Sequence, residues 1–294
     1  MKASARIVAE ADSRGGTRLA VLREESPLLL RRTGPAGADA DVVTVHLVGG
    51  AAGPLPGDEL RLDVEVGPGA RLEVRSVAAS LALPGRPGAA ASRLEVHATV
   101  AAGATLRWLP EPLIAAAGCR HLVRTDVRVA EGGALVWRDD LVCGRHGEPS
   151  GSVHTDVTIR YAGSTLYRHQ LAVGPQAPGW SGAAVLGSSG ATPLGGGRAV
   201  GSVIFAGPDL PPAGLLGGDA AIMPLAGPGM LATAVGADIR QVRAALDPLS
   251  TATDIAGHPA ATAPAGLSAA DGLNPPATAP AGLSATDGLS PAAR

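Results

Sequence analysis

The feature that most constrains the fold of this chain is a pattern that recurs four times, about 30 residues apart. In each copy, alternating apolar and polar residues lead to a short glycine- or alanine-containing break, and a second alternating run follows. The copies cover Leu62–Val74, Val96–Trp108, Thr125–Trp137 and Thr155–Tyr167. Alternation with a period of two is typical of a strand with one buried face. Each copy therefore predicts a β-hairpin with a short loop.

One hairpin cannot bury its apolar face alone, whereas stacked copies share a continuous core. We therefore predict an all-β, mainly antiparallel fold of stacked hairpin repeats. A solenoid-like stack and a sandwich-like pair of sheets both fit this periodicity, so both interpretations stay open. In every copy, the residue three positions before the turn Gly or Ala should point inward. These residues are Val66, Val100, Val129 and Ile159.

The C-terminal part of the chain has a different pattern. Asp238–Leu246 places apolar residues at helical spacing, and Asp238 is a suitable N-cap. Pro248 should stop this short helix soon afterwards. We therefore expect one β domain over residues 1–250 that ends in a helix.

A duplicated segment follows the expected helix. Thr262–Leu273 recurs almost unchanged as Thr278–Leu289, and both copies are rich in Ala, Pro, Gly and Ser. So few bulky residues cannot bury enough apolar surface to offset the entropy of folding. We expect a low-complexity, disordered tail over residues 251–294.

Composition excludes several functions. Lys2 is the only lysine, so the chain has neither a P-loop lysine nor a buried lysine for Schiff-base chemistry. A formal net charge of −2 gives no sign of binding to nucleic acid or to a membrane surface. The first residues lack an apolar signal-peptide core, and no run of apolar residues is long enough to span a membrane. We expect a cytoplasmic protein.

Three stretches resemble the UreD/UreH family of urease accessory proteins. Val45–Val66 is similar to the family's Gly-rich loop, which ends in Gly-Asp before a strand. Trp108–Ile114 is similar to its Trp-Leu-Pro segment, and Leu135–Glu148 to a strand that runs into a Gly-Arg motif with a nearby Gly-Glu. The order and spacing of the stretches agree as well. The segment after Gly69 departs from the family pattern, so the chain is identified as a divergent member.

The resemblance implies a function without catalysis. Members of this family are scaffolds required for nickel insertion into apo-urease. The expected partners are a helical accessory protein of the UreF type, a nickel-loading GTPase of the UreG type and the urease subunits, while a UreE-type chaperone supplies the GTPase with metal. The resemblance further implies that nickel passes through the scaffold transiently, with no permanently bound cofactor.

Four side chains in the third stretch are candidates for a nickel path. They are Asp139, Cys143, His146 and Glu148. Thiolate and imidazole are ligand types suited to nickel, and a series of weak sites suits an ion that must leave as well as enter. A second thiol–imidazole pair is Cys119 with His121, and a packed cysteine beside a surface histidine is the plainer interpretation of both pairs. Arg145 is a candidate for binding carbonyls or carboxylates of a partner.

Two other classes of function stay open. A β-helical carbohydrate-active enzyme would use paired carboxylates such as Asp139 and Asp140, although the scarcity of aromatic residues counts against it. A self-assembling β-repeat protein is the second alternative. Co-purification with apo-urease and the other accessory proteins would separate these readings of the sequence.

Overall fold

The structure is a computed structural model that describes residues 1–34, 41–86, 88–178, 180 and 197–252. The chain divides into two units, Met1–Gly257 and His258–Arg294, and all described residues belong to the first. The predicted tail at 251–294 therefore lies outside the described residues, apart from Thr251 and Ala252, which end a helix. No described helix is long and apolar enough to cross a membrane.

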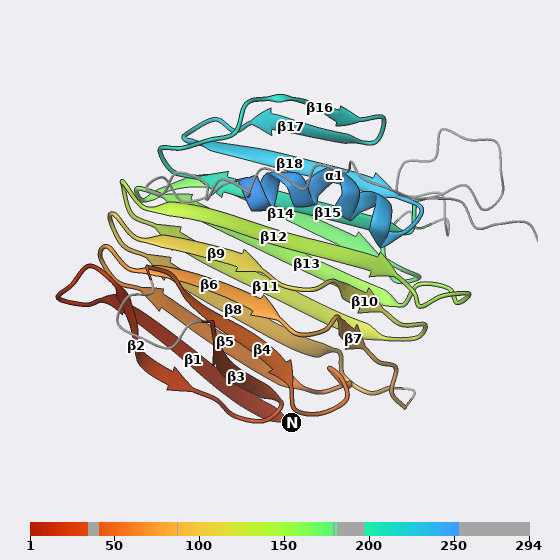
Figure 1. The fold of residues 1–294 in the computed structure, drawn as a ribbon. Helices are drawn as coiled ribbons and strands as arrows, with labels where there is room; N and C mark the ends of the chain where they lie inside the picture. Colours follow the sequence, from red (N-terminus) through yellow and green to blue (C-terminus); the bar gives the residue numbers. More distant parts are fainter. Residues whose placement is uncertain (35–40, 87, 179, 181–196, 253–294) are drawn as a thin grey trace, which may run out of the picture. The chain divides into compact units, whose positions relative to one another are not determined.

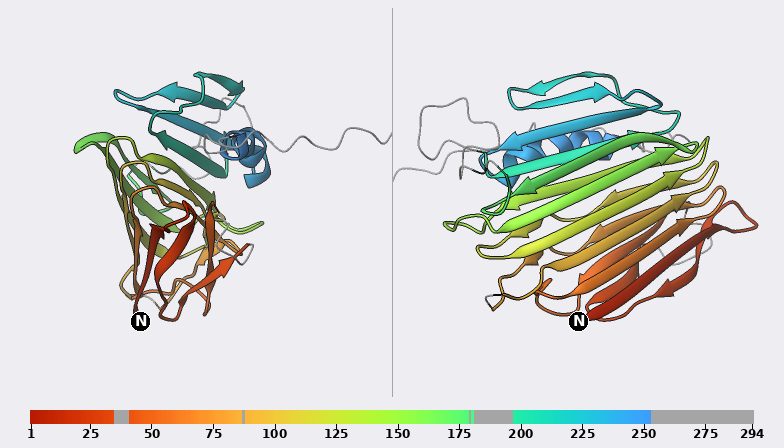
Figure 2. Two further views of the ribbon diagram at one scale, coloured as in Figure 1. Left: turned by 60° about the vertical axis from the view of Figure 1, so that its left-hand side comes forward. Right: turned by 180° about the vertical axis from the view of Figure 1, so that it is seen from behind.

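Two β-sheets lie face to face with the main core between them (Figures 1 and 2). Sheet A contains, in spatial order, β14 (Ser164–Val173), β13 (Ser152–Tyr161), β11 (Arg120–Val129), β8 (Ser92–Val100), β5 (Glu59–Val66), β1 (Lys2–Ala11) and β2 (Thr17–Arg23). Sheet B runs from β16 (Gly214–Gly217) through β17 (Ala220–Pro224), β18 (Gly229–Gly236), β15 (Ala199–Ala206), β12 (Ala134–Cys143), β9 (Thr105–Leu109), β6 (Arg71–Ser76) and β4 (Val43–Gly49) to β3 (Leu28–Thr33). Two short strands, β10 (Leu113–Ala115) and β7 (Ser80–Ala82), continue from β12. The predicted all-β class is confirmed, with features of both a stack and a sandwich.

The prediction of hairpins is wrong for the first three repeats. In each of them the first arm lies in sheet A and the second in sheet B, so the two arms do not pair with each other. In the first repeat, β5 pairs with β1 and β8, while β6 pairs with β4 and β9. All of these pairings are parallel, so the expectation of a mainly antiparallel sheet is also wrong for the stack. Each repeat is an arch between two parallel ladders, and successive arches stack in register.

The loops of the three arches explain how the chain crosses from one sheet to the other. Each loop has four residues, and the N–H of the fourth donates to the carbonyl of the first, as in Ala70 to Gly67 at 3.1 Å. The third residue is a glycine with positive φ, at +71°, +68° and +74° in the three loops. This is the geometry of a type II turn, which needs Gly at that position. The turn carries the chain between sheets instead of reversing it within one.

The fourth repeat does form the predicted hairpin. Strands β13 and β14 pair antiparallel, and only Ala162 and Gly163 separate them. Both loop residues have positive φ, +47° and +83°, as a two-residue type I′ turn requires. Because β14 stays beside β13, it ends sheet A instead of entering sheet B.

The residues predicted to point inward are buried in all four repeats. Val66, Val100, Val129 and Ile159 are at most 3% exposed and belong to one core cluster. The first three form a single row across neighbouring strands, whereas Ile159 lies opposite Val127, two residues out of step. The buried positions are therefore confirmed, with a shift in the fourth copy.

The helix α1 (Ile239–Ala252) packs against β15 and β18 on the outer side of sheet B. Asp238 is its N-cap, as predicted, because its carboxylate accepts from the backbone N–H groups of Arg240 and Gln241. The prediction that Pro248 stops the helix is wrong, since α1 continues to Ala252. Tertiary contacts hold this last turn, because Arg107 and Arg138 both bond to Ser250.

Candidate functional site

Asp139 lies on the inner face of β12, between the two sheets, and is partly buried. Along β12 the inward-facing Leu135 and Trp137 belong to one core cluster, and Leu141 and Cys143 to another, so Asp139 separates two apolar regions. The indole Nε1 of Trp137 donates to its carboxylate at 2.8 Å. Trp137 is fixed in turn by Trp108, with parallel rings whose centroids are 4.7 Å apart. The stacked indoles therefore position the carboxylate.

Burial dominates the electrostatics of Asp139. The residue keeps partial surface exposure, yet the desolvation of its carboxylate raises the pKa to about 6. The hydrogen bond from Trp137 opposes this rise, and the charge of Asp140 adds to it. Burial and the negative charge of Asp139 raise the pKa of Tyr167 on β14 to about 12. Asp139 is thus mostly ionised at neutral pH, in a place that disfavours negative charge.

Asp140 points to the opposite face of β12, beneath α1. It is 5% exposed and accepts from Arg138 at 2.9 Å, while Arg138 also reaches Asp247 of the helix at 2.6 Å. Gly201 makes room for this arrangement, since a Cβ there would lie 2.5 Å from both Asp140 and Val242. These contacts fasten α1 to sheet B. Alternation along β12 puts the carboxylates of Asp139 and Asp140 on opposite faces of the sheet, so they cannot act on one substrate.

The two cysteines and His121 are packed inside the protein. Cys119 and Cys143 belong to the same core cluster, and burial raises the pKa of both thiols, to about 11 for Cys119. Ser150 forms a hydrogen bond with Cys143 that moderates the rise. His121 is buried as well, and its pKa falls to about 4, with Nδ1 2.8 Å from the hydroxyl of Ser92. The expected surface histidine is therefore wrong for His121 but right for His146, which is exposed.

The loop after β12 uses two of the candidates for its own structure. Arg145 and Glu148 form a two-pronged ion pair, with Nη2 and Oε2 3.0 Å apart, and the backbone N–H of Arg145 also donates to Glu148. Arg198 bonds to the carbonyls of Cys143, Arg145 and Glu148 and closes the loop from the other side. Arg145 is largely exposed, so it stays accessible to a partner, but Glu148 already has a cation beside it.

The structure does not bring the four candidates together. Within the described ranges, no three His, Cys, Asp or Glu side chains lie close enough to hold a metal ion. Asp139 and Cys143 share the inner face of β12, whereas His146 and Glu148 lie on the loop. Trp137 and Tyr167, which set the environment of Asp139, are not among the candidates chosen from the sequence. The alternation of β12 gave a signal for Trp137, because it lies two positions from Asp139 and shares its face.

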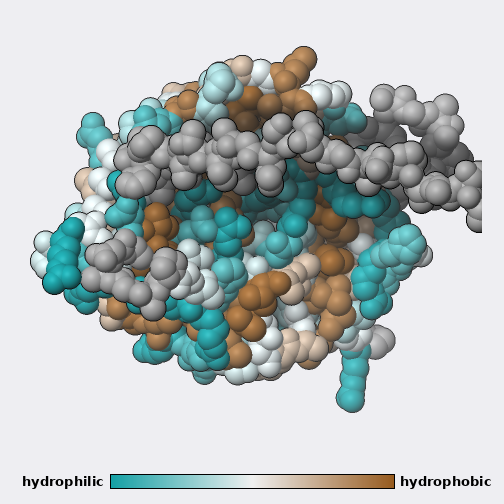
Figure 3. Space-filling model, in the orientation of Figure 1, coloured by the Kyte–Doolittle hydropathy of each residue, from teal (hydrophilic) through white to brown (hydrophobic). Residues whose placement is uncertain are grey.

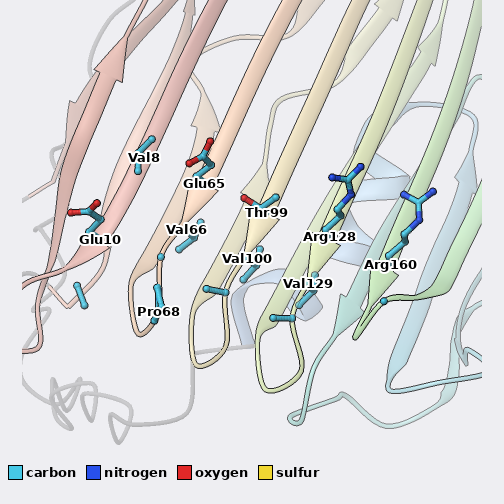
Figure 4. Close-up of a pocket in the computed structure, with 15 residues that line it drawn as sticks. Val8, Glu10, Glu65, Val66, Pro68, Thr99, Val100, Arg128, Val129 and Arg160 are labelled. Atoms are coloured by element: carbon cyan, nitrogen blue, oxygen red, sulfur yellow. The ribbon is translucent and has the colours of Figure 1, made fainter.

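A shallow groove of about 770 Å³ crosses the outer face of sheet A near the arch loops (Figure 4). One row of the sheet lines it, from Glu65 through Thr99 to Arg128 and Arg160. Its charges already have partners: Glu65 pairs with Arg6 at 2.7 Å, and both arginines pair with Asp126. The groove therefore offers paired surface charges rather than a reactive group.

Comparison with known proteins identifies the relatives of this fold and site. A family model described as "UreD urease accessory protein" matches residues 1–265. A protein of Streptomyces griseus named "Urease accessory protein UreD 3" is 48% identical, over 84% of this chain and 95% of its own. A protein of Streptomyces avermitilis named "Urease accessory protein UreD" is 44% identical, over 84% of this chain and 95% of its own. One of the same name from a Parafrankia strain is 41% identical, over 85% of this chain and 88% of its own. The chain therefore belongs to the UreD family of urease accessory proteins.

Proposed function

We propose that this chain is a non-catalytic cytoplasmic scaffold that bridges apo-urease to UreF- and UreG-type accessory proteins and is required for nickel insertion. We propose further that nickel passes transiently between its two sheets. Family membership supports the accessory role, since the relatives are named for it. The single observation that supports the path is the position of the Asp139 carboxylate, which Trp137 holds between two apolar core regions.

The environment of Asp139 suits an ion in transit. A desolvated carboxylate attracts a divalent cation more strongly than one in water, because charges interact more strongly at low dielectric. One carboxylate alone nevertheless makes a weak site, which the ion can leave. Cys143, four residues further along the same face, has a thiol held protonated by burial, so it would ligate only after losing its proton. The interior path thus starts from Asp139, with Cys143 as a slower second contact.

The loop candidates have more limited roles in this proposal. His146 is exposed and offers an imidazole at the surface, where nickel could arrive or depart. Glu148 would have to release Arg145 before it could bind a cation. Arg145, which retains exposed surface, is the group on this loop that a partner's carboxylate could contact.

Reconstituted urease activation tests the proposal. Alanine would replace Asp139, Cys143, His146 and Glu148 one at a time, and activation would be measured with the complete accessory set and nickel. We expect Asp139→Ala to lower activation most and Glu148→Ala least, while size-exclusion chromatography shows intact complexes. Asp156→Ala is the control, because Asp156 lies on the outer face of sheet A, where its carboxylate accepts a hydrogen bond from Gln170.

The outcomes separate the two parts of the proposal. If all four variants assemble and activate urease at wild-type rates, the nickel path is wrong and the scaffold role stands. If the wild-type chain assembles with neither urease nor the accessory proteins, the scaffold role is wrong. The carbohydrate-active alternative loses its support, because Asp139 and Asp140 face opposite sides of β12.

A further inference from the structure

Residues 144–149, which we call the Arg145 loop, close around a single guanidinium group after β12. Nη2 of Arg198 donates to the carbonyl oxygen of Cys143 at 2.7 Å and to that of Arg145 at 3.3 Å. The same nitrogen also donates to the carbonyl oxygen of Glu148. Hydrogen bonds from a charged donor are stronger than those between neutral groups. The backbone of the Arg145 loop therefore takes its shape from a cation that a distant part of the chain supplies.

The main chain of Arg198 is fixed on both sides. Its N–H donates to the carbonyl of Gly236 at 2.8 Å, and its own carbonyl accepts from the N–H of Cys143 at 2.7 Å. The guanidinium approaches the loop closely because residue 144 is a glycine with φ of +83°. A Cβ at Gly144 would lie 2.8 Å from Nη2 of Arg198 and 2.6 Å from the carbonyl oxygen of Glu148. The loop is thus closely fitted to an anchored side chain.

The Arg145 loop presents its own arginine to solvent. The side chain of Arg145 is 55% exposed and binds Glu148 through Nε and Nη2, with Nη2 3.0 Å from Oε2. Hydrophilic side chains gather at the right-hand end of the molecule, where the connection from β12 to β13 lies (Figure 3). A guanidinium has a second edge, formed by Nη1 and Nη2, that fits a carboxylate with two hydrogen bonds. With Glu148 on one edge, Arg145 can therefore bind a carboxylate of a partner on the other.

Arg198 contributes more to the shape of the loop than Glu148 does. The ion pair of Arg145 with Glu148 is largely exposed, and exposed pairs add little to stability. Two of the three bonds from Arg198 are partly buried, and they join the beginning of the loop to its end. Without the guanidinium these carbonyl oxygens would lose a charged donor, which is costly for partly buried groups. The loop would then change conformation, and Arg145 would lose its fixed position.

We propose that Arg198 is a positioning residue for Arg145. Its guanidinium holds the Arg145 loop in the conformation in which Arg145 contacts a carboxylate of a protein partner during urease activation. This inference rests on the proposed function, in which Arg145 is a partner contact, and extends it to a residue 53 positions further along the chain. Arg198 acts on activation through Arg145 alone.

A double-mutant cycle in urease activation tests the inference, with the full-length chain, the complete accessory set and nickel. Arg198→Met removes the guanidinium but keeps an apolar stem, and Arg145→Ala removes the presented group. We expect each to lower the activation rate about tenfold, as truncation of an interface arginine does. Because both changes remove the same contact, the double variant should be no slower than Arg145→Ala alone. Arg124→Met, at an exposed arginine of β11, is the control and should activate at the wild-type rate.

A second variant keeps the test independent of any general loss of folding. Arg198→Lys retains a cation with N–H donors for the carbonyls but lacks the planar guanidinium. It should therefore lower activation less than Arg198→Met does, and again only while Arg145 is present. Melting temperatures of all variants, measured alongside, show whether Arg198→Met folds. If it does not fold, the same cycle with Arg198→Lys decides the question.

The outcomes separate this inference from the proposed function. Losses that multiply in the double variant show that Arg198 acts independently of Arg145, which overturns the inference. Wild-type activation by both Arg198 variants, or by Arg145→Ala, also overturns it but leaves the scaffold role intact. A wild-type chain that does not support activation overturns the proposed function, and this inference with it.

Discussion

The first three repeats and the fourth share one sequence pattern but fold in different ways. In the first three, a four-residue loop sends the second arm into the opposite sheet, and both arms then join parallel ladders. In the fourth, a two-residue loop returns the chain beside itself, and the repeat closes as a hairpin. The difference of two loop residues thus decides whether an arm pairs with its own partner or with neighbouring repeats. Because β14 stays beside β13, sheet A ends there, whereas sheet B continues through β15, β18 and β17 to β16.

The strongest test of this comparison makes an arch into a hairpin. Deleting Ala102 and Gly103 would shorten the second loop to two residues. We expect loss of cooperative unfolding, measured by circular dichroism, because β8 and β9 each pair with two neighbours in separate sheets. The cost should exceed the whole stability of a typical domain, roughly 5–15 kcal/mol.

The reverse change serves as the control for the deletion. Two glycines inserted between Ala162 and Gly163 lengthen the hairpin loop but leave the β13–β14 ladder in place. Loop closure costs only about 0.6 kcal/mol for each doubling of length, so this variant should melt within a few degrees of the wild type. A deletion variant as stable as the insertion variant would show that loop length does not select the arch.

The second prediction concerns the enclosed space that arches create. Alternation along the strands turns Asp139 on β12 toward the facing sheet, whereas it turns Asp63 on β5 toward solvent. The folded state binds the proton of Asp139 more tightly than the unfolded chain does, since its pKa is raised from 3.8 to about 6. The free energy of unfolding should therefore fall as pH rises from about 4 to about 6. Asp139→Asn should raise the free energy of unfolding by roughly 2–3 kcal/mol at pH 8, and hardly at all at pH 3.5.

Asp63→Asn should change the free energy of unfolding in the opposite direction, lowering it at pH 8. The hydrogen bonds and charge of Arg61 hold the pKa of Asp63 below its ordinary value. The pair therefore stabilises the folded state at pH values above the ordinary pKa, and this stabilisation is lost in acid. As a surface pair it contributes about 1 kcal/mol or less. Urea unfolding at pH 3.5 and pH 8 measures both variants. If Asp139→Asn follows the pH dependence of Asp63→Asn, Asp139 is not enclosed by the sheets.

The smallest prediction compares the two kinds of loop by backbone strain alone. Gly103 has φ of +68°, with space around it for a Cβ, whereas Ala162 has φ of +47° and already bears the cost of a side chain in the left-handed region. Gly103→Ala should destabilise the protein by about 1 kcal/mol, and Ala162→Gly should stabilise it by up to about 1 kcal/mol. Thermal unfolding of the two single variants and of the double variant measures these effects, which should cancel in the double variant. Two shifts of the same sign would contradict the assignment of the loops.

Local pattern could predict which candidates share a face of β12, but it could not predict the environment of that face. Asp139 and Cys143 are four residues apart, so alternation along β12 puts them on one face, and the structure turns that face inward. Alternation could not show that Tyr167, from another repeat, faces Asp139 across the interior. Nor could it show that Glu148 pairs with Arg145, because Gly144 ends the strand pattern before them.

The sequence was enough to predict the strands of the four repeats, four of their buried residues and the N-cap of α1, because these features depend on side-chain periodicity and on contacts within a few residues. Val66, Val100 and Val129 are buried where alternation placed them. Only the tertiary structure decided which strands pair, because each arm can satisfy its backbone hydrogen bonds either with its own partner or with an arm about 30 residues away. The same holds for Pro248, where contacts from distant Arg107 and Arg138 outweigh a local signal to end the helix.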